Sequence, residues 1–393
     1  MTIYFVAGEV SADNHGAALM RCLRELNGEL KFIGRGGPQM QEMADESAKG
    51  RIPGGEGFKN WISDAAVLGL WEVLRKYGYF REQFHETLHE IRQSKPDAVV
   101  LIDYPGFNLR LARALRREAP RQKIIYYISP QVWAWNRGRI TRMAHFIDLV
   151  LCIFPFEVDL YTEAGLRASF VGHPMIERLR DRRIEAQRDP NLIGLFPGSR
   201  SREVRKIFPV LVETACELLN HNPNLRFEVA AASEQLAREM KRLWPSHPAD
   251  QTRGLEARAI IQIKIGQTAE IMQRAWAGIV ASGSATLEAA YFRLPFVLIY
   301  KVAWPTYLAA RLVVNVKYLG MPNLLADKEV VPEFIQHRAE PNAVVKAVQP
   351  LIDNTSARER MVSQFDAIVS KLGDSGASRR AARAIIEEIG SAP

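Results

Sequence analysis

The chain has 393 residues, 47% of them hydrophobic and 24% charged, which is typical of a folded protein and excludes a disordered one. Its length predicts two domains. The formal net charge of +8 is spread along most of the chain and fits anionic lipid or phosphorylated substrates. It fits nucleic acid less well, because no nucleic-acid-binding motif accompanies it, and a merely basic surface is the alternative.

The chain shows no sign of export or of membrane insertion. Its first residues include neither a basic region nor a long apolar one, so we expect no secretory signal. No apolar run approaches the ~20 residues of a membrane-spanning helix. Cys22, Cys152 and Cys216 lie far apart, and we expect buried thiols in a reducing compartment rather than metal ligands or disulfides. These features predict a cytoplasmic protein.

Short apolar runs alternate with helical patterns through the first half of the chain. The predicted strands are Ile3–Ala7, Leu30–Gly34, Ala98–Ile102, Ile124–Ile128, Leu149–Phe154 and Ala168–Val171. The helical patterns between them include Asn14–Leu26, Trp71–Ser94 and Asn108–Glu118. Continuous apolar strands separated by helices indicate βαβ units and an open, mostly parallel sheet. The fold class is therefore α/β.

Polar residues follow the first of these strands directly. Glu9, Ser11 and Asp13 lie where they either bind a polar substrate or cap the following helix. The glycine-rich segment Gly34–Gly37 lacks the dinucleotide spacing after the first strand, which argues against an NAD-dependent enzyme.

An apolar stretch that ends in basic residues runs from Ala65 to Tyr77 and is followed by Tyr79 and Phe80. Such a stretch either enters a membrane interface or grips an acyl chain. The alternative is a helix that faces the protein core.

Asp103 follows the wholly apolar strand Ala98–Ile102. We expect it to face a ligand cleft, where partial burial raises the pKa of the carboxyl group toward that of a general base; the alternative is a capping or turn residue. His173 follows the last strand of this half and has either a structural role or a place in the cleft. Trp133 and Trp135 are expected to be packing residues.

The polar stretch Arg178–Asn191 separates the two halves, so we predict a first domain at 1–185 and a second at 186–355. Strands of the second are Leu192–Phe196, Arg226–Ala231, Ile260–Ile263, Gly278–Ala281 and Phe296–Tyr300. The tail, 356–393, is expected to form two helices that pack back on the first domain. Two doubly wound domains in tandem predict a ligand cleft between the carboxyl ends of both sheets.

The segment Pro197–Glu203 directly follows a predicted strand and has the composition of a phosphate site. Gly198 lets the backbone approach a ligand, and Ser199 is expected to cap the next helix. Arg200 and Arg202 add planar guanidinium groups suited to phosphate. The alternative is an ordinary strand–turn–helix with surface arginines.

The segment Ser282–Glu288 begins a second helix of this kind, after the strand Gly278–Ala281. Ser284 and Thr286 lie where hydroxyl and N–H groups can bind a diphosphate, and Glu288 where a carboxylate can accept hydrogen bonds from ribose. The alternative is a capping motif in which Glu288 favours the helix start.

Taken together, these segments resemble the lipid-A-disaccharide synthase family over nearly the whole chain. The segments that carry the resemblance are Gly8–Asp13, Gly34–Met40, Leu68–Leu74, Ile102–Asn108, Ser129–Trp135, Pro155–Glu157, Phe170–Pro174, Pro197–Glu203, Ser282–Glu288, Pro322–Asn323 and Val331–Gln336. The resemblance implies a glycosyltransferase-B fold of two Rossmann-like domains with the active site between them. It also implies inverting transfer from UDP-2,3-diacylglucosamine to 2,3-diacylglucosamine 1-phosphate, with release of UDP.

The resemblance further implies roles for single residues. Asp103 would deprotonate the 6-hydroxyl of the acceptor. The remaining matches are the phosphate motif Gly198, Ser199 and Arg200; the nucleotide helix with Ser284, Thr286 and Glu288; the donor-side Asn323, Glu333 and Gln336; and the N-terminal Glu9, Ser11 and Asp13. No metal and no cofactor are expected. The chain departs from the family at Ala12, where glycine is usual, and in its long Ala48–Asp64 stretch, both of which bear on acceptor binding.

The implied partners are the UDP-linked acylated donor, the acylated sugar 1-phosphate acceptor and, peripherally, the cytoplasmic face of the inner membrane. A homodimer is compatible with the resemblance, and nucleic acid is not expected. Two other functions stay open at this point: a UDP-N-acetylglucosamine 2-epimerase, which has the same two-lobed plan, and a nucleotide-binding membrane scaffold without activity.

Overall fold

The computed structural model describes residues 1–48, 57–62, 77–131, 138–244, 261–304, 307–308 and 316–390. The chain forms two compact units, Met1–Pro174 with Leu372–Pro393, and Met175–Lys371. Their division lies ahead of the predicted boundary at 185, so α9 (Met175–Arg180) belongs to the second unit. Of the tail helices, α18 (Thr355–Lys371) lies in the second unit and α19 (Ala377–Gly390) in the first.

The first unit contains a seven-stranded parallel sheet of order β3-β2-β1-β4-β5-β6-β7. Its strands are β1 (Thr2–Ala7), β2 (Lys31–Gly36), β3 (Phe58–Asn60), β4 (Ala98–Ile102), β5 (Lys123–Tyr127), β6 (Leu149–Cys152) and β7 (Ala168–Phe170). Every apolar run predicted as a strand in this half forms one. The short edge strand β3 was not predicted, because Phe-Lys-Asn contains no apolar run.

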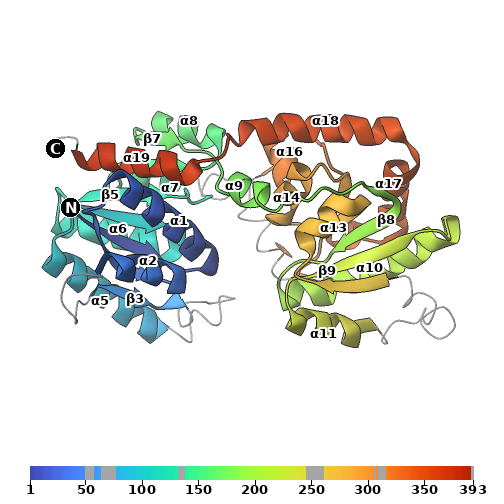
Figure 1. Ribbon diagram of the computed structural model, residues 1–393, viewed down its shortest axis with the longest axis horizontal. Coiled ribbons are helices and arrows are strands. Elements are labelled where there is room, and N and C mark those ends of the chain that lie inside the picture. The colour runs from blue at the N-terminus through green and yellow to red at the C-terminus, as the bar shows by residue number, and fades with distance from the viewer. Residues whose placement is uncertain are drawn as a thin grey trace. The chain divides into compact units, whose positions relative to one another are not determined.

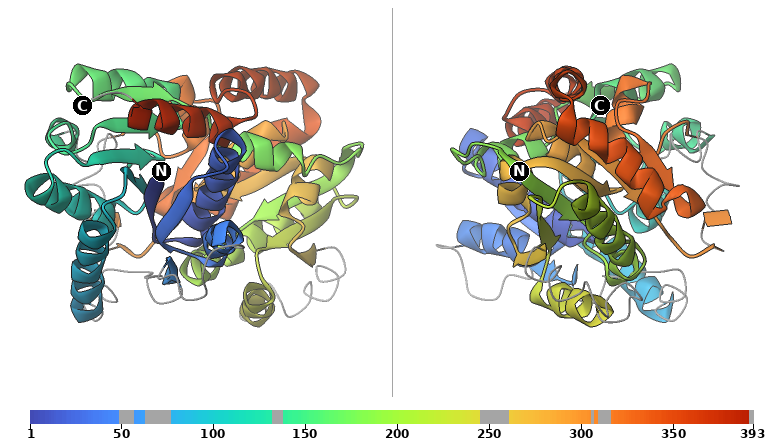
Figure 2. Two further views of the ribbon diagram at one scale, coloured as in Figure 1. Left: turned by 60° about the vertical axis from the view of Figure 1, so that its left-hand side comes forward. Right: turned by 90° about the vertical axis from the view of Figure 1, so that its right-hand side faces the viewer.

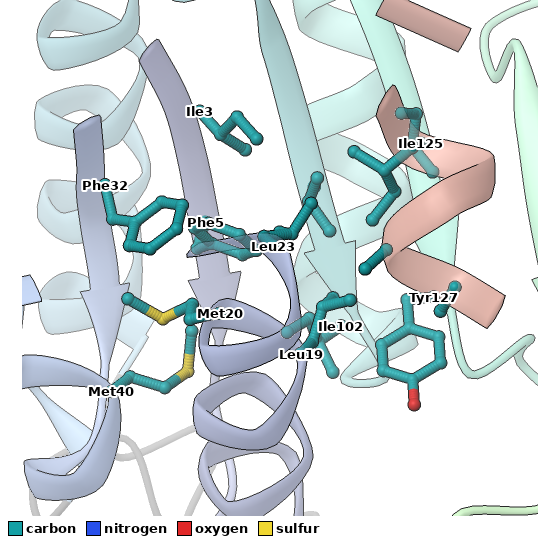
Figure 3. Close-up of a cluster of buried hydrophobic side chains, with 14 of the residues drawn as sticks. Ile3, Phe5, Leu19, Met20, Leu23, Phe32, Met40, Ile102, Ile125 and Tyr127 are labelled. Carbon is teal, nitrogen blue, oxygen red and sulfur yellow. The ribbon is translucent and has the colours of Figure 1, made fainter. Parts of the chain in front are cut away.

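Helices cover both faces of this sheet (Figures 1 and 2). They are α1 (Val10–Leu26), α2 (Pro38–Ala48), α5 (Tyr77–Ser94), α6 (Pro105–Glu118), α7 (Gly138–Met143), α8 (Pro155–Glu163) and α19. On one face, Ile3 and Phe5 of β1 pack in a buried cluster with α1 and α19, and α19 lies along α1 (Figure 3). Tyr4, between them in the strand, belongs to the other face, where its hydroxyl donates a hydrogen bond to Glu90 of α5 (2.5 Å).

Arg35 ties α5 to the sheet from the middle of β2. Its side chain is fully buried, and its Nη2 lies 2.9 Å from Glu86 Oε2 and 2.6 Å from Glu90 Oε1. A buried guanidinium is tolerated only when carboxylates neutralise it, so this network fixes α5 on the sheet. The segment Gly34–Gly37 is thus part of the scaffold of the first unit.

The second unit contains a six-stranded parallel sheet of order β10-β9-β8-β11-β12-β13. Its strands are β8 (Asp189–Phe196), β9 (Arg226–Ala231), β10 (Ile261–Ile265), β11 (Ala275–Ala281), β12 (Phe296–Tyr300) and β13 (Glu333–Ile335). The helices are α9, α10 (Ser201–His221), α11 (Glu234–Leu243), α13 (Thr268–Arg274), α14 (Ala285–Tyr291), α16 (Met321–Ala326), α17 (Pro341–Asp353) and α18, with a short 3₁₀ turn at Gln336–Arg338. Only the edge strand β13 was not predicted.

Both sheets have one point at which the chain reverses the direction in which it adds strands. In the first unit this point lies between β1 and β4, and in the second between β8 and β11. Ligands of open α/β sheets bind outside the carboxyl ends of the strands at such a switch point. The order of the strands therefore singles out one loop pair in each unit.

Two predictions fall on residues that the structure does not describe. The apolar stretch that begins at Ala65 is among them, except for its last residue, Tyr77, and so are Trp133 and Trp135. Within the described ranges, no helix has the length and apolar character that crossing a bilayer requires.

Candidate functional site

Asp103 and Glu9 meet at the switch point of the first sheet. Asp103 follows β4 and Glu9 follows the neighbouring strand β1. Burial and the negative charge of Glu9 together raise the pKa of Asp103 to about 6, against a smaller lowering by a hydrogen bond from the Tyr104 backbone. A carboxyl group that titrates near pH 6 can accept and release a proton close to neutral pH, which is the property required of a general base.

The turn that carries Asp103 has an unusual backbone. Asp103 and Tyr104 both lie in the left-handed region, at φ 46° and 51°, which residues other than glycine rarely adopt. Hydrogen bonds hold this turn: the Asp103 carbonyl accepts from Asn108 Nδ2 (2.8 Å) and from the Tyr126 hydroxyl, and its N–H donates to the Tyr127 carbonyl (3.1 Å). The main chain of Asp103 is therefore fixed by its surroundings.

The loop after β1 packs directly against this turn. A Cβ atom at Gly8 would lie 2.4 Å from Cδ1 of Tyr104, so only glycine permits the approach. The Tyr104 ring also meets Trp61 edge-on, with ring centroids 6.2 Å apart, and Trp61 Nε1 donates to the Ala7 carbonyl (2.7 Å). Burial, aided by the charge of Glu9, raises the pKa of the Tyr104 phenol to about 12. The two loops thus form one packed, acidic corner.

Asp13 is buried and makes its contacts within the protein. Its Oδ1 accepts from the backbone N–H groups of Gly37 (2.9 Å) and Met40 (3.0 Å), and its Oδ2 from that of Gln39 (3.1 Å). Of the two roles left open for it, these contacts fit capping, but of α2 and not of the helix that follows it. Glu9 and Ser11, in contrast, are exposed at the start of α1.

His173 lies away from this corner. It follows β7, three strand positions from β4, which corresponds to ~14 Å across the sheet. Its ring packs on Phe154, with centroids 5.2 Å apart, and its backbone N–H donates to the Leu372 carbonyl (2.9 Å). The structure does not bring it to the switch point with Asp103, and its contacts fit the structural alternative.

The turn after β8 has a backbone conformation at Gly198 that favours glycine. Gly198 has φ +104°, and a Cβ atom there would lie 2.6 Å from Oε2 of Glu203. The helix α10 begins at Ser201 and its N-cap is Arg200, so the prediction that Ser199 caps it was wrong. Ser199 still belongs to the turn through Gly198, and the helix starts two residues later. Ser199, Arg200 and Arg202 are exposed beside the first turn of α10.

In the turn after β11, the backbone is accessible to a ligand, whereas some of the predicted side chains already have partners within the protein. Gly283 has φ +144° and open space where a Cβ atom would lie, and Ser284 is the N-cap of α14 without a side-chain capping bond. The buried Thr286 hydroxyl donates to the Gly283 carbonyl (2.7 Å), and Glu288 Oε1 pairs with Arg178 Nη2 (2.6 Å). Gly283 and Ser284 are the exposed part of this turn.

The buried Asn323 and the half-buried Glu333 form a scaffold beside this region. Asn323 Nδ2 donates to Glu333 Oε1 and to the Val331 carbonyl, both at 2.8 Å, and its Oδ1 accepts from Val330 N and Val331 N. Glu333 Oε1 also accepts from Gly320 N at 2.8 Å. These side chains use their polar atoms to hold the backbone at both ends of α16.

Gln336 likewise holds the backbone of the segment that follows β12. Its Oε1 accepts from Val302 N (2.8 Å) and its Nε2 donates to the Val302 carbonyl (3.2 Å), while its own backbone lies at φ 55°. Because β12 is the neighbour of β11, this pairing fixes the chain next to the Ser282–Ser284 turn.

The sequence did not single out three residues that shape these sites. Asn108 and Tyr126 hold the Asp103 carbonyl, and Arg178 neutralises Glu288 from α9. A buried asparagine on an amphipathic helix was the one available signal, since the partners of Tyr126 and Arg178 are distant in sequence. Among the described residues, no three His, Cys, Asp or Glu side chains are placed to hold a metal ion together.

Comparison with known proteins adds family information to this geometry. The sequence profile of the family described as lipid-A-disaccharide synthetase matches residues 3–386. The lipid-A-disaccharide synthase of Geobacter sulfurreducens is 36% identical over 396 residues, covering 99% of this chain and 97% of that protein. That of Myxococcus xanthus is 33% identical, with 98% and 97% covered.

Solved structures with low sequence identity share the fold. UDP-GlcNAc 2-epimerase from Neisseria meningitidis, bound to UDP-GlcNAc, superposes with a TM-score of 0.56 at 13% identity, covering 99% of both chains. MurG of Acinetobacter baumannii gives 0.54 at 14%, covering 98% of this chain and 99% of its own. With the two parallel sheets, these matches confirm the predicted α/β fold of glycosyltransferase-B type.

Proposed function

Because this chain belongs to the lipid-A-disaccharide synthase family and has that family's glycosyltransferase activity in lipid A biosynthesis, we propose the following reaction for it. It joins UDP-2,3-diacylglucosamine to 2,3-diacylglucosamine 1-phosphate and releases UDP. The observation that supports the residue assignment best is the placement of Asp103, which titrates near pH 6 at the switch point of the first sheet.

Asp103 is the general base of the proposed transfer. Its carboxylate takes the proton of the acceptor 6-hydroxyl as that oxygen forms a bond to the anomeric carbon of the donor. The bond from that carbon to the UDP oxygen breaks in the same step, and its electron pair leaves with UDP. One displacement inverts the anomeric configuration. Glu9, at the N-cap of α1, and Ser11, in the first turn of that helix, contact the acceptor sugar.

The second unit receives the UDP leaving group. The negative charge that builds on the diphosphate is stabilised by the backbone at Gly198 and Ser199, by the exposed guanidinium groups of Arg200 and Arg202, and by the start of α14 at Ser284.

Most of the other predicted nucleotide residues hold the backbone of the site in place. Thr286 fixes the Gly283 carbonyl, and Glu288 is held by Arg178 where it can still accept from ribose. Asn323, Glu333 and Gln336 hold the surrounding backbone in place. No step of this reaction is assigned to a metal or a cofactor.

The proposed place of action is the cytoplasmic face of the inner membrane, to which the protein binds peripherally, with nucleic acid having no part. The net charge of +8 supports attraction to an anionic surface, and both substrates carry acyl chains. The family resemblance is compatible with a homodimer.

An omission assay tests the proposal. Purified protein is incubated with both acylated sugars, or with each alone, while UDP and the lipid product are quantified together. We expect UDP and disaccharide 1-phosphate in equal amounts, and neither when one substrate is absent. UDP binding without product would contradict the proposed reaction and favour a scaffold. Epimerised product from UDP-N-acetylglucosamine alone would favour an epimerase.

A further inference from the structure

A pocket of about 590 Å³ in the first unit lies between α6 and the region of α7, outside the residues assigned so far. Six arginines line it: Arg110, Arg113, Arg116, Arg117, Arg139 and Arg142. His145 adds a further nitrogen donor, and none of the lining residues is acidic. So many guanidinium groups around one hollow create a strongly positive potential that attracts anions.

Most of this charge lacks a carboxylate partner. Arg116 pairs with Asp148 (2.6 Å), and Arg142 donates to the Gly138 carbonyl (3.3 Å). Within the described part of the chain, Arg110, Arg113 and Arg117 form no ion pair and are exposed. Guanidinium groups that repel one another and have no internal counterion are stabilised when a phosphate binds between them, because its oxygens accept paired N–H bonds.

The pocket begins next to the proposed base. Pro105 and Gly106, its first lining residues, directly follow the Asp103–Tyr104 turn. With a rise of 1.5 Å per residue, Arg110 lies about 7 Å and Arg113 about 12 Å along α6 from Pro105. Helical side chains lean toward the helix N-terminus, so both guanidinium groups can reach back toward the end of the helix that follows Asp103.

We propose that this arginine pocket binds the phosphate group of the sugar phosphate acceptor, an inference that rests on the proposed function. The acceptor carries its 1-phosphate and its reactive 6-hydroxymethyl group on the two ring carbons that flank the ring oxygen. With the hydroxyl at Asp103, the phosphate lies about one helical turn away, within reach of Arg110 and Arg113. The pocket lining starts at Pro105, two residues after Asp103, and this proximity in the chain favours the substrate phosphate over a membrane lipid.

The test uses the full-length variants Arg110→Gln, Arg113→Gln and their combination, which remove the guanidinium charge and keep helix propensity. Arg121→Gln, an exposed arginine of the same unit outside the pocket, is the matched control. The KM for the acceptor is measured with 2,3-diacylglucosamine 1-phosphate and with the same acylated sugar lacking phosphate.

For the phosphorylated acceptor, we expect the KM of the double variant to rise roughly 10- to 100-fold, as follows from losing two charge-assisted contacts. The KM for the donor, the values for the unphosphorylated acceptor and the control variant should all stay unchanged. An unaltered KM, or an equal change with both acceptors, would overturn the proposal. So would a loss of binding to phosphatidylglycerol vesicles with the acceptor KM preserved, which would assign the pocket to the membrane.

Failure of the proposed function can be distinguished from failure of this inference. If the unmodified protein forms no disaccharide, the proposed function is wrong, and titration with glucosamine 1-phosphate alone then examines the pocket. Binding that weakens in the double variant but not in Arg121→Gln would keep the pocket as a sugar phosphate site. Equal binding of glucosamine 1-phosphate by the unmodified protein, the double variant and Arg121→Gln would show that the pocket is not a sugar phosphate site.

Discussion

At the scale of single residues, Asp103 combines a strained backbone with surroundings that disfavour its charge. Its pKa of about 6 predicts that kcat/KM rises with pH through about 6 and levels off above it, because the base must be ionised. Glu9→Gln removes a nearby negative charge that raises this pKa, so the acid limb should move to lower pH. A pH profile of both proteins measures this, and identical acid limbs would show that Glu9 does not act on the base.

The same burial makes ionised Asp103 costly to the fold. Its folded pKa of about 6 exceeds its ordinary value of 3.8, so its stabilising contribution is complete below pH 3.8 and is lost as the pH rises through 6. Asp103→Asn cannot ionise, and it should therefore be more stable than the unmodified protein at pH 8, by on the order of 1–3 kcal/mol. The difference should shrink as the pH falls below 6.

Thermal midpoints of both proteins at pH 5 and pH 8 check this prediction. Asp181→Asn is a suitable control, because it makes the same change of side chain at a position that is 69% exposed. A difference between Asp103→Asn and the unmodified protein that does not change with pH would mean that the Asp103 carboxylate is solvated in the folded state.

At the scale of elements, the start of α2 depends on a residue of α1. Asp13→Ala would leave three backbone N–H groups, of Gly37, Gln39 and Met40, without their acceptor in a buried place. We expect a loss of about 2–4 kcal/mol of unfolding free energy, measured by chemical denaturation. The exposed neighbour variant Ser11→Ala should change stability by less than about 0.5 kcal/mol. Equal stability of the two variants would contradict a capping role for Asp13.

Most strands could be predicted from the sequence because they contain apolar residues in succession or alternation, whereas the short edge strands β3 and β13 could not. β4, Ala-Val-Val-Leu-Ile, is buried on both faces and is visible in the sequence for that reason. The edge strands β3 and β13 have three residues each and charged or polar members. Glu333 of β13 accepts hydrogen bonds from Leu319, Gly320 and Asn323, which lie earlier in the chain. No local sequence pattern therefore predicts this strand.

At the scale of the whole molecule, the alternation of strands and helices predicted two doubly wound sheets, and their strand order then assigns one switch point to each. Asp103 and Gly198 could be singled out as candidates because Asp103 directly follows the apolar strand β4 and Gly198 lies two residues after β8. The partners of the other site residues could not. Arg178 reaches Glu288 from a helix far earlier in the chain, and Asp13 caps a helix that begins only after β2. Such pairings depend on tertiary structure.

The most direct test of the account is to measure turnover and UDP affinity of Asp103→Asn in one preparation. The proposed base belongs to the first unit and the proposed nucleotide residues to the second, so the two properties should separate. We predict that the initial rate of disaccharide formation falls roughly 10²- to 10⁴-fold, the usual contribution of a general base, while the Kd for UDP is unchanged. Full turnover in this variant, or a loss of UDP binding in step with turnover, would contradict the account.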